Sequence, residues 1–174
     1  LQPNQIHALP QVSNDQWLMI NISHGLVRLA TSQSKCKTDI TLAFISKTET
    51  GRFHYPRSSQ LFIEAITETS FEIARSKNLH HESIDFLSDW LFELHLIRNP
   101  AKAEERLEAL LDLLIERLGK RTSEGYKLEF LLPHSRIAEM IGTTRSTVSR
   151  TIGAMKRSGK LKINSDQNYL ILNE

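Results

Sequence analysis

The sequence predicts an α+β fold in which an antiparallel β-sandwich or roll precedes a helical part that ends in a winged helix-turn-helix. Three observations predict it. Short apolar runs bounded by turn residues occupy the first 76 residues. Apolar residues at helical spacing begin near residue 80. Near the carboxyl terminus, a glycine turn joins two short predicted helices, and two short strands follow them.

The composition is that of a globular protein. The chain has 174 residues, enough for one large domain or two small ones, with 40% hydrophobic and 24% charged residues. No apolar run is long enough to cross a membrane and no signal pattern opens the chain, so we expect no membrane partner and a cytoplasmic location. Cys36 is the one cysteine. A disulfide framework and four-cysteine zinc or iron–sulfur sites are excluded, and we expect no metal and no cofactor.

The charge is unevenly distributed along the chain. The net charge is +2, but residues 133–162 hold seven Lys or Arg and one acid, a net charge of +6, whereas the remaining 144 residues sum to −4. A basic segment on a mildly acidic body favours a polyanionic partner at that end, although basic runs are also common on solvated faces.

Five strands are predicted in the first 76 residues, each four to eight residues long and rich in β-branched and aromatic side chains. They span 17–23, 26–31, 40–46, 61–68 and 71–75. His24-Gly25 is a turn signal, so we expect the first two strands to form a hairpin. The segment before Trp17 shows no regular pattern.

A helix is predicted from about His80 to Arg98, with four apolar residues at heptad spacing. They are Ile84, Leu87, Leu91 and Leu94. Phe86, Trp90 and Ile97 widen this stripe. The stripe is either the core face of one domain or a dimer seam flanked by packing on the chain's own sheet, and we favour the seam. Phe92 and Leu96 point away from it.

The next helix is predicted to begin at Asn99-Pro100, with Asn as N-cap and Pro at the first helical position. Its apolar stripe extends from Ala103 to Leu118, and Gly119 ends it. A polar connector at 120–127 and a short strand at 128–132 are expected to follow.

The most informative segment is residues 132–156, LPHSRIAEMIGTTRSTVSRTIGAMK. It predicts one helix over 134–141, a positive-φ turn at Gly142, and a second helix over 145–157 capped by Thr143 or Thr144. Inward side chains are expected at Ile137, Met140, Ile141, Val148, Ile152 and Met155. Residues 161–172 then predict a strand, a turn over 164–168 and a strand, which together would form a β-wing.

This helix-turn-helix would place the outer face of its second helix in the DNA major groove. Arginine binds guanine bidentately, hydroxyls contact bases or phosphates, and a helix N-terminus favours a phosphate. The candidate DNA contacts are Thr143, Thr144, Arg145, Ser146, Thr147, Ser149, Arg150, Lys156 and Lys160. The competing interpretation is an ordinary helical hairpin with a solvated basic side, which does not account for the spacing of glycine, threonines and arginines.

The strand-rich first half, the heptad-spaced helix and the segment LPHSRIAEMIGTTRSTVSRTIGAMKRSGKL together resemble the Crp/Fnr family of bacterial transcription regulators. Within it, the motif is most similar to that of the cyanobacterial global nitrogen regulators. The resemblance implies a jelly-roll-like β-roll (a double-stranded β-helix) over 1–78, a dimerisation helix over 79–99 and a winged helix-turn-helix over 100–174. It also implies a homodimer on palindromic double-stranded DNA, activation of transcription and contact with RNA polymerase.

The resemblance leaves the effector unknown, and the sequence argues against cyclic AMP. Cyclic-nucleotide relatives carry a Gly-Glu phosphate loop before an Arg-Ser pair, whereas the loop over 47–60 has no Gly-Glu, and its Arg57-Ser58 pair is out of register. No phosphate-binding loop, nucleophile elbow or HExxH motif is present, so we expect no enzymatic activity. The alternative function is a small-molecule or partner-binding β-roll module with a vestigial DNA-binding domain.

Overall fold

The computed structural model describes residues 1–13, 16–32, 39–56, 59–77, 85–166 and 168–172. The chain divides into two compact units, Leu1–Phe92 and Glu93–Glu174, and the division falls within helix α1 (Phe86–Ile97). The boundaries expected from the sequence, at 78/79 and 99/100, lie on either side of this point. The dimerisation helix predicted over 79–99 stays a prediction, because this division does not test it.

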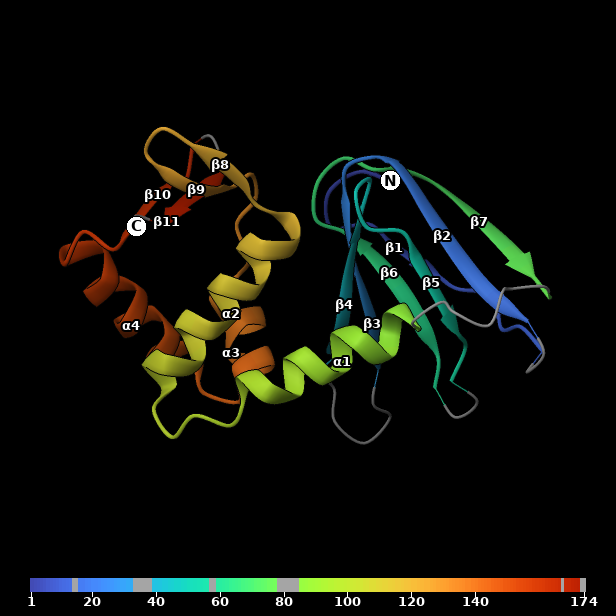
Figure 1. Ribbon diagram of the computed structural model, residues 1–174, viewed down its shortest axis with the longest axis horizontal. Coiled ribbons are helices and arrows are strands. Elements are labelled where there is room, and N and C mark those ends of the chain that lie inside the picture. The colour runs from blue at the N-terminus through green and yellow to red at the C-terminus, as the bar shows by residue number, and fades with distance from the viewer. Residues whose placement is uncertain (14–15, 33–38, 57–58, 78–84, 167, 173–174) are drawn as a thin grey trace. The chain divides into compact units, whose positions relative to one another are not determined.

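The N-terminal unit is an antiparallel β-roll of two sheets (Figure 1). Its strands are β1 (Ile6–Ala8), β2 (Trp17–His24), β3 (Leu26–Ser32), β4 (Asp39–Ser46), β5 (Gly51–His54), β6 (Leu61–Ala65) and β7 (Ser70–Ser76). One sheet has the order β1-β6-β3-β4 and the other the order β5-β2-β7. The predicted fold class is confirmed.

The predicted hairpin between β2 and β3 is wrong. β2 pairs with β5 and β7, whereas β3 pairs with β4 and β6, so the chain changes sheet at His24-Gly25. Gly25 has a φ of +90°, and a Cβ there would lie 2.2 Å from the carbonyl oxygen of Glu68. The turn signal was therefore correct, but the strands that it joins pair elsewhere.

Two strands of this unit had no signal in the sequence. β1 lies in the segment before Trp17 and pairs with β6, and the four-residue β5 pairs with β2. Both are too short to show an alternating pattern. The Arg57-Ser58 pair, Cys36 and Ile84 lie outside the described residues.

Helix α1 has one buried face and one exposed apolar face. Leu87, Trp90 and Leu94 are buried, and the Trp90 ring lies 5.7 Å from that of Phe44 in β4. By contrast, Leu91, Phe92 and Leu96 are 42%, 60% and 46% exposed. Of the predicted seam residues that the structure describes, Leu87 and Leu94 are thus buried within the chain itself, and only Leu91 is available to a partner.

The C-terminal unit contains three further helices and a four-stranded sheet of order β10-β11-β9-β8 (Figure 1). The helices are α2 (Ala103–Leu118), α3 (His134–Ile141) and α4 (Arg145–Arg157). The strands are β8 (Lys120–Thr122), β9 (Gly125–Leu128), β10 (Leu161–Asn164) and β11 (Tyr169–Leu172). β10 and β11 form the predicted antiparallel wing.

Two local predictions in this unit are wrong. Helix α2 begins at Ala103, with Lys102 as an extended N-cap, and not at Asn99-Pro100. The amide of Asn99 instead bonds back to Leu96, which closes the end of α1. The segment over 120–127, predicted as a connector, forms β8 and most of β9, and the strand predicted at 128–132 ends at Leu128. The wing strand β11 pairs with β9, a partner that local sequence does not reveal. In the described part of the chain, no helix is both long enough and apolar enough to cross a membrane.

Candidate nucleic-acid interface

Helices α3 and α4 form the helix-turn-helix at the boundaries that the sequence predicts. The inward residues are buried as expected, with Met140, Ile141 and Val148 each 1% exposed. Helix α2 packs against both helices. The buried faces fix the rotation of α4 about its axis, and its opposite face is left to solvent.

The turn between the two helices is tightly defined. Gly142 has φ 64° and ψ 51°, in the left-handed region, and the amides of Gly142 and Thr143 both donate to the carbonyl of Ala138. The bond from Thr143 is the 6→1 bond of a Schellman motif and the bond from Gly142 is the 5→1 bond of an αL cap, and glycine is the favoured residue at this position in both. Thr143 is therefore part of the turn and not the cap of α4.

Thr144 caps helix α4. Its Oγ1 accepts a hydrogen bond from the amide of Thr147 at 3.2 Å, and the hydroxyls of Ser146 and Thr147 lie 2.9 Å from it. Of the two threonines that the sequence offered, the structure selects Thr144, whose backbone is extended at φ −96° and ψ 152°. This cap holds the first turn of α4 together.

The N-terminal face of α4 exposes Arg145, Ser146, Ser149 and Arg150. Within the described part of the chain, neither Arg145 nor Arg150 is engaged in a hydrogen bond or an ion pair. The first turn of α4 contains no acidic residue. Two free guanidinium groups, two hydroxyls and the positive end of a helix thus lie on one exposed surface, which can accept a phosphate or base edges.

The two predicted lysine contacts, Lys156 and Lys160, lie beyond residues 145–150. Lys160 donates to Oε1 of Glu108 on α2 at 2.9 Å, and this hydrogen bond raises the pKa of Lys160. Lys162 is paired in the same way with Glu124 at 2.9 Å, and its pKa is also raised. Lys156 is exposed on α4 beside an apolar cavity. Residues 145–150 are thus the part of the predicted set that the structure brings together.

Two arginines that sequence reasoning missed hold the C-terminal end of α3. Arg98 donates from Nε to the carbonyl of Met140 at 2.8 Å and from Nη2 to that of Glu139 at 2.9 Å. Arg106 donates from Nη1 to the carbonyls of Ile141 and Gly142 at 3.0 and 3.2 Å. Together with the two amide bonds to the Ala138 carbonyl, they satisfy the last four carbonyls of the helix, which have no partner within it. Cationic groups also stabilise the negative end of the helix dipole.

The comparisons with known proteins agree with this geometry. Residues 105–174 match the family described as the Crp-like helix-turn-helix domain. This part of the chain is therefore similar to Crp-like helix-turn-helix domains. The chain is 31% identical over 84 residues to the regulatory protein CysR of Synechococcus elongatus, a match that covers 47% of this chain and 41% of CysR. It is 29% identical over 80 residues to electron transport regulator A of Shewanella oneidensis, covering 46% of this chain and 31% of that protein.

Solved structures extend the likeness to the whole fold. FixK2 of Bradyrhizobium japonicum matches 99% of this chain and 90% of its own with a TM-score of 0.71 and 16% identity. A CRP-family regulator of Thermus thermophilus matches 100% and 91% with a TM-score of 0.69 and 16% identity. The β-roll, the helix α1 and the Crp-like domain therefore follow one another as in these regulators.

Among the described residues, no group of three or more His, Cys, Asp or Glu side chains could hold a metal ion.

Proposed function

We propose that this protein is a sequence-specific DNA-binding transcription regulator of the Crp/Fnr type. The observation that carries the proposal is the exposed N-terminal face of α4, where Arg145 and Arg150 lie beside a capped helix start with no intramolecular partner among the described residues. Such a face suits the major groove, where arginine pairs with guanine O6 and N7. The protein acts in the bacterial cytoplasm, activates transcription through RNA polymerase and has no enzymatic activity.

The regulator acts as a homodimer. Support comes from α1, where Leu91, Phe92 and Leu96 are exposed on one helix of the chain. Large apolar side chains gathered on an exposed face favour an interface. A two-fold dimer reads two half-sites about one helical turn apart, so the operator is a palindrome.

Two likenesses support a cyanobacterial type of regulator. The segment over 132–156 resembles the cyanobacterial global nitrogen regulators, and the chain is similar to CysR over 84 residues. Neither likeness identifies a small-molecule effector. The absence of a Gly-Glu pair over 47–60 argues against cyclic AMP as an effector.

Selection of bound sequences from random duplex DNA tests this function. We expect the purified protein to recover a palindrome, and its affinity to fall steeply with salt because lysine and arginine contacts displace counterions. Recovery of no motif, together with salt-independent binding, would favour the alternative of a ligand-binding β-roll with a vestigial DNA-binding domain.

Sedimentation of the variant Leu91→Glu, together with its binding to the selected palindrome, tests the dimer. Because Leu91 is 42% exposed, the charge is tolerated in a folded monomer but is desolvated in the interface. We expect the variant to sediment as a monomer and to lose tight binding to the palindrome. If the variant sediments with the mass of a dimer, Leu91 of α1 does not lie in the dimer interface.

A further inference from the structure

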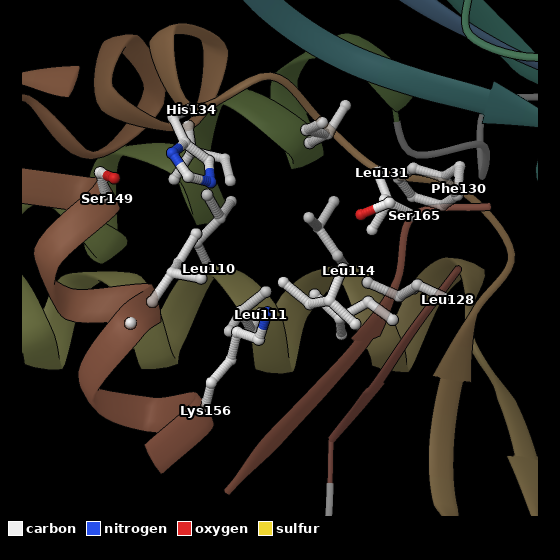
Figure 2. A pocket seen from close by; sticks show the side chains of 16 residues that line it. Leu110, Leu111, Leu114, Leu128, Phe130, Leu131, His134, Ser149, Lys156 and Ser165 are labelled. Carbon is white, nitrogen blue, oxygen red and sulfur yellow. The ribbon is translucent and has the colours of Figure 1, made fainter. Parts of the chain in front are cut away.

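The C-terminal unit has a partly open cavity of about 370 Å³ between its helices and its sheet (Figure 2). Well-packed protein interiors contain few voids larger than one water molecule, which occupies about 30 Å³ in the liquid. Sites for small molecules have volumes of roughly 300–1,000 Å³. The cavity therefore has the size of a ligand site and not that of a packing defect.

The cavity is apolar along most of its wall. Leu110, Leu111 and Leu114 of α2 lie between α4 on one side and Phe130 and Leu131 on the other (Figure 2). Further leucines and isoleucines complete this surface. A wall of this kind excludes water and favours the apolar body of a ligand.

The polar groups of the cavity are few and carry one sign of charge. Among the described residues that line the cavity, none is acidic, and Lys156 is the one lysine or arginine. In the described part of the chain Lys156 has no ion pair, whereas Lys160 and Lys162 are each bound to a glutamate. An ammonium at an apolar cavity with no neighbouring carboxylate complements an anion.

The same face of α4 supplies a second polar group and close access to the helix. Ser149, Gly153 and Lys156 all line the cavity and are four and three residues apart, so they form one stripe of the helix. Gly153 has no side chain, and a Cβ there would meet only Nη1 of Arg157, at 3.5 Å. An anionic head group can therefore lie along the backbone between the Ser149 hydroxyl and the Lys156 ammonium.

We propose that this cavity binds a small amphipathic carboxylate, with its aliphatic or aromatic body among the leucines and its carboxylate at Lys156 and Ser149. Binding would neutralise a positive charge on α4 and occupy Ser149, one of the proposed DNA contacts. This consequence rests on the proposed function, and it makes the ligand a competitor of DNA. The binding of the carboxylate itself does not depend on it.

Titration calorimetry of the full chain with decanoate, in the absence of DNA, tests the site. We expect saturable binding of one decanoate per chain, weaker binding of decanol and no binding of decylamine. Lys156→Gln should weaken decanoate binding at least about tenfold, because it removes a charge-assisted contact. Lys160→Gln is the matched control, since it removes one charge outside the cavity, and it should leave binding unchanged.

A second variant keeps the test independent of the lysine. Gly153→Leu should fill the cavity beside α4 without loss of helix, because leucine is a better helix former than glycine. We expect it to abolish decanoate binding. Absence of saturable heat with the unchanged protein, equal binding of decylamine, or equal effects of Lys156→Gln and Lys160→Gln would overturn the proposal.

Binding to a random-sequence duplex separates the site from the proposed function. Decanoate should weaken DNA binding and reduce the salt slope by about 1, the share of one phosphate contact. If decanoate binds and DNA does not, the cavity is a ligand site and the proposed function fails. If both bind without mutual effect, the competition is overturned.

Discussion

Arg28 in the N-terminal unit and Arg145 in the C-terminal unit carry the same charge in opposite surroundings. Arg28 is 0% exposed, and its guanidinium lies 2.6 Å from Glu64, 3.1 Å from the Thr41 hydroxyl and 3.7 Å from Asp39. Arg145 is exposed and unpaired within the described residues. A buried guanidinium must be paired to offset its lost hydration, whereas an exposed one retains its donors for a ligand.

Arg98 and Arg106 stand between these extremes. Within the part of the chain that the structure describes, their guanidinium groups pair with no carboxylate and donate instead to backbone carbonyls at the end of α3. They are positioning residues, because they fix the turn that orients α4. The three uses of arginine predict three different results of mutation: loss of stability alone, loss of stability together with DNA affinity, and loss of DNA affinity alone.

The largest effect is expected for Arg28→Met. Removing Arg28 leaves the carboxylate of Glu64, which is 16% exposed, charged and without its guanidinium partner, at a cost of up to about 3–5 kcal/mol in the free energy of unfolding. Urea unfolding followed by tryptophan fluorescence measures it, because Trp17 and Trp90 both lie in the N-terminal unit. The double variant with Glu64→Met should recover much of the loss. Equal losses in the two variants would show that the orphaned carboxylate is not the cause.

The hydrogen bonds from Arg98 and Arg106 to the carbonyls of α3 are expected to contribute less to the free energy of unfolding. Arg106→Ala or Arg98→Ala removes two hydrogen bonds from α3, and we expect each to cost about 1–3 kcal/mol and to weaken DNA binding as well. Hydrogen exchange over 134–157 measures the stability of the motif. Lys102→Ala is the control, because its ion pair with Glu105 is exposed and contributes at most about 1 kcal/mol. Unchanged hydrogen exchange in both arginine variants would show that these hydrogen bonds do not stabilise the helix-turn-helix.

The exposed arginines are expected to affect DNA and not stability. Arg145→Ala or Arg150→Ala should cost about 1–3 kcal/mol in binding to the selected operator, with unfolding unchanged within about 0.5 kcal/mol. Lys160→Ala and Lys162→Ala are the comparison, and we expect them to weaken all DNA sequences alike. If all four variants act equally on operator and random DNA, α4 is not the recognition helix.

The smallest effect on the free energy of unfolding is expected at Asp112 on α2. Glu64 pairs with Arg28, whereas no ion pair of Asp112 is found among the described residues. Burial and the nearby charge of Glu108 raise its pKa above the ordinary value of 3.8. The ionised form is therefore disfavoured in the folded state, and stability falls as the pH rises through this pKa. Asp112→Asn should increase the free energy of unfolding slightly at pH 7 and leave it unchanged at pH 3. If Asp112→Asn increases the free energy of unfolding equally at pH 3 and pH 7, the increase comes from packing and not from the charge of Asp112.

The sequence by itself determined the elements whose cause is local. The bounds of α3 and α4, the left-handed Gly142 and the wing over 161–172 follow from helical spacing, caps and short strand signals within a few residues. The same holds for the order of a strand-rich half before a helical half. Each of these patterns acts over one or two turns of chain, and distant residues did not override it.

Only the tertiary structure decided which local elements meet. It placed β2 and β3 in different sheets, buried Leu87 while leaving Leu91 exposed, and brought Arg98 and Arg106 to α3 across 42 and 35 residues. The cavity beside α4 likewise needs α2, α3, α4 and the sheet together. An apolar stripe shows that a face must be covered, but not by which neighbour. A long arginine has no local signature, because the carbonyls that it satisfies belong to another part of the chain.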